Sequence, residues 1–248
     1  AGMKLTVLGL RREPTSLDDL RQLGDVDWVV AGAQGRSSWS SLLSRLPKDA
    51  HSLFPDEMQA CLQQQLQREW DWIVFDHART GAALDAVLSR RGKARICYVA
   101  HNVETDVRPA VAREMGSRLV SLPYRYEGLK EAKLGSRLLS ASDTVIAITQ
   151  EDALRLRELG ARSVFPTPPV YFGPVVADRT IDASVPRRLM LIGSFDWVAK
   201  QANLARFLTV GAAPLATAGI HIDIIGSVPA RLAETIKGTY RNVALHGS

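Results

Sequence analysis

A short apolar run that stops abruptly at polar residues is the feature that most constrains the fold of this chain. Residues 95–100 read R-I-C-Y-V-A, and His101, Asn102 and Glu104 follow at once. A short run rich in β-forming residues predicts a buried strand. In an open parallel α/β sheet, ligands bind beyond the carboxyl ends of the strands. The pattern therefore places these three side chains where chemistry could occur, although they could equally serve only to cap the next helix.

Similar apolar runs recur along the chain and alternate with segments of helical periodicity. Strands are predicted at residues 3–9, 26–31, 72–76, 143–149 and 163–165, and helices at 37–46, 55–70, 80–90 and 150–159. This alternation indicates an α/β domain with a parallel sheet covered on both faces. Because the 72–76 strand runs into Asp76 and His77, we expect these two residues at the same edge as His101. They too have an alternative role as a helix cap.

Residues 105–141 are helical in pattern and strongly basic, with seven Arg and Lys side chains against four Asp and Glu. Pro123 should divide this segment into two helices. Aromatic and leucine residues are interleaved with the basic ones, which suits a surface that rests on anionic lipid headgroups. The alternative is a solvated helix face above an ordinary core stripe.

The composition changes after residue 165. A proline-rich stretch without periodicity, residues 166–186, predicts a linker between a domain at 3–165 and a second domain at 187–248. The second series has strands at 188–193, 220–226 and 242–245 and helices at 204–210 and 229–236. These elements are too few for a complete doubly wound domain, so we expect a complete first domain and a partial second one.

Several functional classes are made improbable by simple counts. The two cysteines, Cys61 and Cys97, suggest neither a disulfide framework nor a metal site, and they fit a reducing, cytoplasmic setting. A net charge of +5 is modest for a nucleic-acid binder but suits anionic ligands or an anionic membrane surface. No apolar run approaches the roughly 18 residues that span a bilayer. No G-x-G-x-x-G follows the first strand, which argues against NAD or FAD binding at that turn.

Several motifs then occur in a characteristic order. The chain reads H-N-x-E at 101–104, A-S-D-T-V-I-A-I-T at 141–149, G-S-F-D-W-x-x-K-x-x-N at 193–203, I-I-G at 224–226 and N-V-x-L-H-G at 242–247. From about residue 95 onward, this combination resembles the retaining family 4 glycosyltransferases of GT-B architecture. The resemblance implies two Rossmann-like domains that face each other across a cleft. The first domain would take the acceptor and the second a nucleotide-sugar donor.

The resemblance also implies roles for individual residues. His101 matches the histidine that approaches the donor sugar, and Asn102 and Glu104 lie beside it as further catalytic candidates. Gly193 matches the glycine that lets the backbone approach the donor phosphates, and Lys200 matches the lysine that contacts the diphosphate. A lysine ammonium can neutralise the charge that builds on the leaving diphosphate, so neither a metal nor a cofactor besides the donor is expected.

The chain departs from that family in ways that keep other readings open. Ser194 stands where many relatives carry a second cationic contact, an arginine, and the family's E-x₇-E segment lies beyond Leu245, so the fragment itself is expected to be inactive. The full protein would transfer a sugar to a glycan or lipid-linked acceptor in surface polysaccharide synthesis, in the cytoplasm or at the inner face of the membrane. The alternatives are a GT-B sugar-nucleotide epimerase and a non-catalytic, glycosyltransferase-like scaffold.

Overall fold

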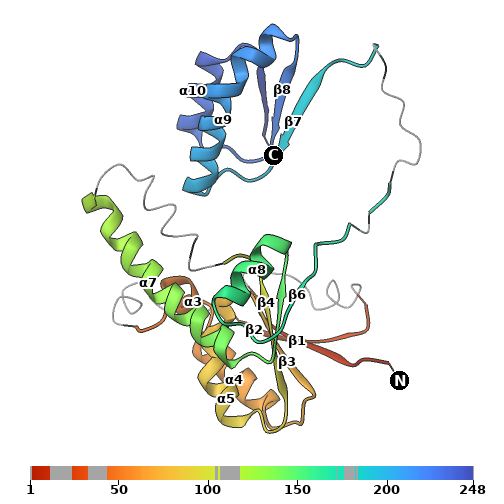
Figure 1. The fold of residues 1–248 in the computed structure, drawn as a ribbon, viewed down its shortest axis with the longest axis vertical. Coiled ribbons are helices and arrows are strands. Elements are labelled where there is room, and N and C mark those ends of the chain that lie inside the picture. The colour runs from red at the N-terminus through yellow and green to blue at the C-terminus, as the bar shows by residue number, and fades with distance from the viewer. Residues whose placement is uncertain are drawn as a thin grey trace. The chain divides into compact units, whose positions relative to one another are not determined.

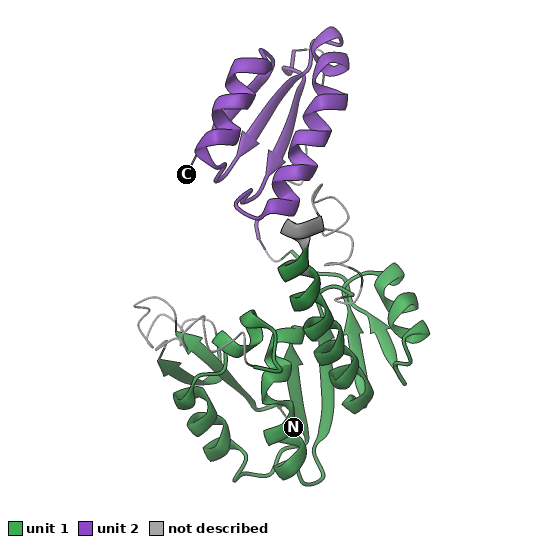
Figure 2. Ribbon diagram, turned by 90° about the vertical axis from the view of Figure 1, so that its left-hand side faces the viewer, with its two compact units in different colours: residues 1–171 green, residues 172–248 purple. Residues whose placement is uncertain are grey.

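The computed structural model describes residues 2–11, 24–32, 44–103, 106, 118–171, 173–175, 182 and 184–247. The chain forms two compact units, Ala1–Tyr171 and Phe172–Ser248 (Figure 2). The division falls inside the proline-rich stretch at 166–186. Each unit is a mixed α/β structure built on parallel strands, as the alternating pattern predicts (Figure 1).

The described residues of unit 1 form two parallel sheets. The smaller pairs β1 (Leu5–Arg11) with β2 (Val26–Gly32). The larger has the order β3-β4-β5-β6, with β3 at Trp72–Asp76, β4 at Arg95–Ala100, β5 at Thr144–Ala147 and β6 at Val164–Pro166. The expectation of a single sheet is therefore wrong, because no ladder joins the two groups of strands among the described residues. The strand predicted at 72–76 is confirmed at both ends.

The helices of unit 1 differ from the predicted ones mainly at their ends. They are α3 (Lys48–Ser52), α4 (Asp56–Gln65), the 3₁₀-helix η1 (Ala78–Ala83), α5 (Leu84–Arg90), α7 (Arg118–Ala141) and α8 (Gln150–Glu158). The helix predicted at 55–70 ends early, at Gln65. The indole Nε1 of Trp70 donates to the backbone carbonyl of that last helical residue at 2.8 Å. Of the helix predicted at 37–46, residues 44–46 are bends, and residues 37–43 lie outside the described ranges.

The helix predicted to break at Pro123 does not break. α7 continues through this proline, which lies in its second turn. A proline there removes one intrahelical hydrogen bond near the helix start, and the long remainder of α7 is anchored by buried leucines, Leu134 and Leu138. The predicted break therefore overstates the local effect of one residue against the packing of the rest.

The core of unit 1 lies on one face of the larger sheet. The strand side chains on that face form one cluster with buried leucines of the helices. The strands contribute Phe75, Ile96, Tyr98 and Val145, and α4, α5, α7 and α8 contribute Leu62, Leu84, Leu138 and Leu156. Residues that alternate with them on β3 and β6 are open, since Val74 and Phe165 are 54% and 56% exposed. On that same face Cys97 of the inner strand β4 is only 7% exposed, so this face is open at the outer strands and covered at β4. Helices on both faces stay a prediction. Cys97 is buried and free, as expected, and burial raises the pKa of its thiol.

Unit 2 has a three-stranded parallel sheet in the order β7-β8-β9. Its elements are β7 (Arg188–Ile192), α9 (Val198–Thr217), β8 (His221–Ile225), α10 (Ala230–Thr239) and β9 (Val243–His246). The helix predicted at 204–210 is far longer, because small residues on both sides continue its pattern. Leu204, Leu208 and Ala212 of α9 pack on Ile222 and Ile224 of the sheet. No helix in the described ranges is long and apolar enough to cross a membrane.

Candidate functional site

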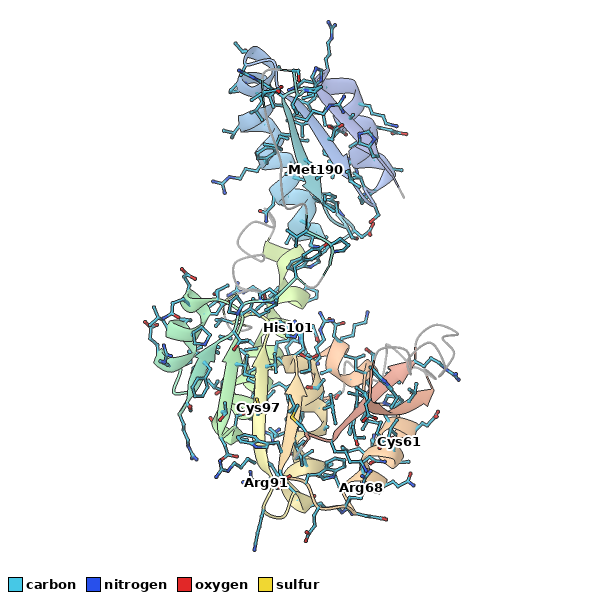
Figure 3. All side chains as sticks on the ribbon, turned by 90° about the vertical axis from the view of Figure 1, so that its right-hand side faces the viewer. Cys61, Arg68, Arg91, Cys97, His101 and Met190 are labelled. Carbon is cyan, nitrogen blue, oxygen red and sulfur yellow. The ribbon has the colours of Figure 1, made fainter. Side chains whose placement is uncertain are left out.

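The carboxyl edge of the larger sheet in unit 1 brings together residues that are 25 positions apart in sequence. Asp76 is the last residue of β3 and pairs in register with Val99 of β4, so His101 follows one strand just as His77 follows its neighbour. The Nε2 atom of His101 lies 2.7 Å from Oδ1 of Asp76. The contacts of His101 with Asp76 and with the ring of His77 confirm the expectation that the three residues share an edge. Figure 3 labels His101 at this edge.

The Asp76 contact defines what His101 can do chemically. A carboxylate oxygen only accepts hydrogen bonds, so the ring nitrogen facing it carries the hydrogen. In a neutral ring, Nδ1 of His101 then keeps its lone pair and can accept a hydrogen bond from a hydroxyl group. Both side chains are partly open to solvent, at 42% for His101 and 72% for Asp76. A small ligand could therefore reach the ring.

His77 is held in an unusual backbone conformation beside this pair. Its φ of 75° lies in the left-handed region, which costs a non-glycine residue on the order of 1–3 kcal/mol. Two of its hydrogen bonds hold the residue in place: its N–H donates to the carbonyl of Val99 at 3.0 Å, and its Nδ1 accepts from the N–H of Arg79 at 3.2 Å. The second bond makes His77 the cap of η1, so the capping alternative holds for this residue.

The electrostatics of His77 favour its neutral form. Burial is the largest cause, and the charges of Arg79 and His101 act in the same direction, so the pKa of His77 lies below its ordinary value. The carboxylates of Asp76 and Asp49 oppose this shift. The centroids of the two imidazole rings, His77 and His101, are 5.2 Å apart with the planes tilted by 44°. The edge thus holds His77, which is strained and caps η1, and His101, whose ring is oriented by the carboxylate of Asp76.

Two further residues, Asn102 and Glu104, are predicted for this edge. Asn102 is exposed in the bend after β4. Glu104 lies outside the described residues, so its predicted role stays a prediction. Within the described ranges, His, Cys, Asp and Glu side chains form no group of three that could hold a metal ion.

The corresponding edge of unit 2 is made by two glycines in close contact. Gly226 follows β8 with a φ of 120°, and a Cβ atom built there would lie 2.1 Å from the carbonyl oxygen of Gly193. Position 226 therefore requires glycine both for its backbone conformation and for space. Position 193 does not, because a Cβ there would meet only the ring of Phe195 at 3.9 Å. The fold of the described residues leaves free space at Gly193 itself.

A carboxylate ties the loops after β7 and β8 to each other. Oδ2 of Asp196 accepts from the hydroxyl of Ser194 at 2.5 Å and from the hydroxyl of Ser227 at 2.6 Å. The N–H of Phe195 donates to the carbonyl of Ser227 at 2.8 Å. These hydrogen bonds from Ser194 and Ser227, with a smaller effect of the Lys200 charge, hold the pKa of Asp196 below its usual value. Asp196 is therefore ionised at neutral pH.

α9 begins directly at this edge. Its N-cap residue, Trp197, makes no side-chain hydrogen bond to the helix, and the first turn contains no acidic residue. The first N–H groups of a helix carry partial positive charge and attract anions. Lys200 lies in the same turn and adds a full positive charge. Gly193, Ser194 and Lys200, the residues predicted to contact the donor, thus lie between the end of β7 and the first turn of α9.

Sequence reasoning missed three contributors to these edges. Asp196 and Ser227 join the loops of unit 2, and Gly226 makes the close approach to Gly193 possible. The S-x-D spacing of Ser194 and Asp196 and the I-I-G-S ending of β8 were visible signals. The sequence gives no signal that Asp196 would accept a hydrogen bond from Ser227, which is 31 residues away.

Comparison with known proteins supports the fold. No family model and no curated protein sequence matches the chain. Among solved structures, a mutant of TarM from S. aureus, in complex with fondaparinux, alpha-GlcNAc-glycerol and UDP, matches 77% of this chain and 36% of its own at a TM-score of 0.51 and 13% identity. A UDP-glucosyltransferase from Polygonum tinctorium matches 99% of this chain and 65% of its own, again at a TM-score of 0.51 and 13% identity.

These likenesses show that the chain has the α/β fold of GT-B glycosyltransferases. The chain spans about a third of the length of the first neighbour and just under two thirds of the second. The predicted fold class is therefore confirmed, and function has to be argued from the two sheet edges.

Proposed function

We propose that the full-length protein is a glycosyltransferase that moves a sugar, with retention, from a nucleotide-sugar to a glycan or lipid-linked acceptor. The observation that carries this proposal is the start of α9, which has no side-chain cap, carries Lys200 in its first turn and follows the open space at Gly193 by five residues. A diphosphate needs such a combination of positive charge and close backbone approach.

The chemistry of the reaction fits this arrangement. Breaking the bond between sugar and diphosphate places negative charge on the leaving group, and that charge is stabilised by cations and oriented N–H groups already in position. Lys200 and the first turn of α9 would supply both. His101, held by Asp76, would accept a hydrogen bond from a sugar hydroxyl and so orient the sugar.

The wider setting is part of the same proposal. A donor nucleotide-sugar and a glycan or lipid-linked acceptor are the expected partners, and surface polysaccharide synthesis in the cytoplasm is the expected context. Among the solved neighbours, TarM binds UDP in its structure, which supports a nucleotide partner in general. The resemblance to family 4 is the basis for retention and for the acceptor class.

A thermal-shift screen of the full-length protein against UDP-, GDP-, ADP- and dTDP-sugars tests the proposal. A donor at about 100 times its dissociation constant should stabilise the protein by roughly 2.7 kcal/mol. Lys200→Ala should weaken that response, whereas Arg206→Ala, later on the same helix, should not. If none of the four donors shifts the unfolding transition, the proposal is wrong.

One observation favours a second candidate, a non-catalytic scaffold. The carboxylate of Asp196 lies near Lys200 and offsets part of its positive charge. The hydroxyl groups of Ser194 and Ser227 donate their hydrogens to that carboxylate and do not point them at a ligand. A diphosphate would meet less positive charge than in relatives with an arginine after the glycine. The scaffold predicts that Lys200→Ala leaves the cellular function of the full-length protein intact, and the transferase predicts that function is lost.

A further inference from the structure

The outward face of α7 carries a stripe of large apolar side chains. Leu122, Tyr126 and Leu129 follow one another at spacings of four and three residues, which places them on one side of a helix. They are 55%, 52% and 71% exposed. Figure 1 shows the N-terminal half of α7 extending away from the sheet of unit 1. The stripe lies on this extended half and is left open to solvent.

The charged residues around the stripe are basic. Arg125 and Lys133 are exposed on the same side, and no acidic partner of either lies within ion-pair distance among the described residues. The Lys130 ammonium lies 4.6 Å from the ring centroid of Tyr126. Lys130 is itself buried and paired with Glu127, so the exposed positive charge beside the stripe comes from Arg125 and Lys133.

The acidic residues of α7 are turned the other way. Glu127 is only 16% exposed, pairs with Lys130 at 3.1 Å and accepts from the N–H of Lys48 at 2.7 Å. Glu131 lines a small cavity with Pro47 and Ala78. The carboxylates of α7 thus face the interior of unit 1, and the basic side chains Arg125 and Lys133 lie on the outward face.

The C-terminal half of α7 fixes the helix to the unit. Leu134 and Leu138 are buried, and both lie against Gly81 of η1 so closely that a Cβ atom there would be 3.3 Å from Leu134. Arg137 pairs with Asp85 of α5. The outward stripe is therefore presented by a rigid element and not by a loop.

We propose that the outward face of α7 docks onto an anionic lipid surface. Leucine and tyrosine side chains would enter the boundary between headgroups and acyl chains, where the amphipathic ring of tyrosine is favoured. Arg125 and Lys133 would lie against the headgroup phosphates. Among the described residues of α7, the exposed charged side chains beside the three apolar ones are basic. This fits such a surface better than a protein partner, because a specific protein interface needs matched charges of both signs at its rim. The proposal does not rest on the proposed transferase activity.

Vesicle flotation tests the proposal with the full chain. Vesicles of phosphatidylcholine alone and of phosphatidylcholine mixed with phosphatidylglycerol are compared, and enrichment is expected only on the anionic ones, with a decline as salt is added. Lys133→Gln and Arg125→Gln should each lower partitioning about fivefold. Leu129→Ser should lower it about tenfold, because its side chain no longer enters the interface.

A matched control is available on a neighbouring helix. Leu154 of α8 is 53% exposed, so Leu154→Ser changes another exposed leucine, outside the stripe, and should leave partitioning unchanged. Thermal unfolding of each variant reports whether it is folded. Equal binding to neutral and anionic vesicles, no binding to either, or an equal loss in Leu154→Ser would each overturn the proposal. Capture of an acidic protein by this face without vesicle binding would also overturn it.

Discussion

The imidazole Nε2 of His101 and the carboxylate Oδ1 of Asp76 meet at 2.7 Å across the ends of two neighbouring parallel strands. This contact follows from topology, because β3 and β4 pair in register and end side by side. It gives the histidine a defined hydrogen-bonding direction at an exposed edge. The contact is therefore better placed to orient a ligand than to stabilise the fold.

Asp76→Asn tests that role. An exposed ion pair contributes no more than about 1 kcal/mol, so the unfolding temperature should change little. If the protein is a transferase, loss of the partner that orients its histidine should lower kcat about 10- to 100-fold. Asp85→Asn is the control, since Asp85 is equally exposed and pairs with Arg137. Equal losses in both variants would show that Asp76 has no special role.

His77 should titrate below its ordinary range. Burial and the nearby Arg79 lower its pKa, so the unfolded ring binds a proton more readily than the folded one. Its contribution to stability is therefore complete above about pH 6.5 and is lost as the pH falls from there toward the folded pKa. Ring resonances followed by NMR should give a midpoint below 6.5.

A pair of arginine variants checks the cause of that shift. Arg79→Gln should move the midpoint of His77 upward, because one repelling charge is removed. Arg90→Gln, at the end of α5, should not move it. A wild-type midpoint at or above 6.5 would contradict the electrostatic account.

Lys200 should matter for nucleotide binding more than other basic residues of α9. We expect Lys200→Ala to weaken UDP binding by the full-length protein about tenfold, the loss of one charge-assisted contact. Ser194→Arg should strengthen it by a similar factor, because it adds a cation beside the same helix start. Isothermal titration calorimetry measures both, with Arg206→Ala as the control. Tighter binding by Lys200→Ala would exclude a diphosphate at this edge.

Gly226→Ala should destabilise unit 2. The methyl group would need a left-handed backbone and would meet the Gly193 carbonyl oxygen at 2.1 Å, so a loss of about 2–4 kcal/mol is expected. Hydrogen exchange should show the loss in β7 and β8 first. Gly238→Ala is the contrast, because Gly238 lies in α10 with open space around its Cα and should gain up to about 1 kcal/mol. Similar effects at both positions would be inconsistent with this packing.

Local signals in the sequence predicted most of the elements. The strand ending in Asp76 and the helix start predicted at residue 150 depend on neighbouring residues and are confirmed. At that helix start, the hydroxyl of Thr149 accepts from the N–H of Asp152 at 3.0 Å. The continuation of α7 through Pro123 depends on leucines buried several turns away. The separation of β1 and β2 from the larger sheet depends on contacts between distant segments. Neither can be read from local periodicity.

The site shows the same division. The polar ends of β3 and β4 indicated where Asp76 and His101 would meet, since parallel strands share an edge. The junction of Ser194, Asp196 and Ser227 joins two loops that are far apart in the chain, and no single spacing encodes it. Roles assigned to Asn102, Glu104 and Lys200 come from resemblance and stay predictions.

The hydrogen bonds that join the loops after β7 and β8 have a consequence for ligand binding. Asp196 accepts hydrogen bonds from both serines, and Gly226 packs closely against Gly193. This edge of the sheet is therefore preorganised before a ligand binds. Little ordering entropy then remains to be lost on association. Selectivity at such a preorganised edge comes from excluding ligands whose shape does not match it, and not from induced fit.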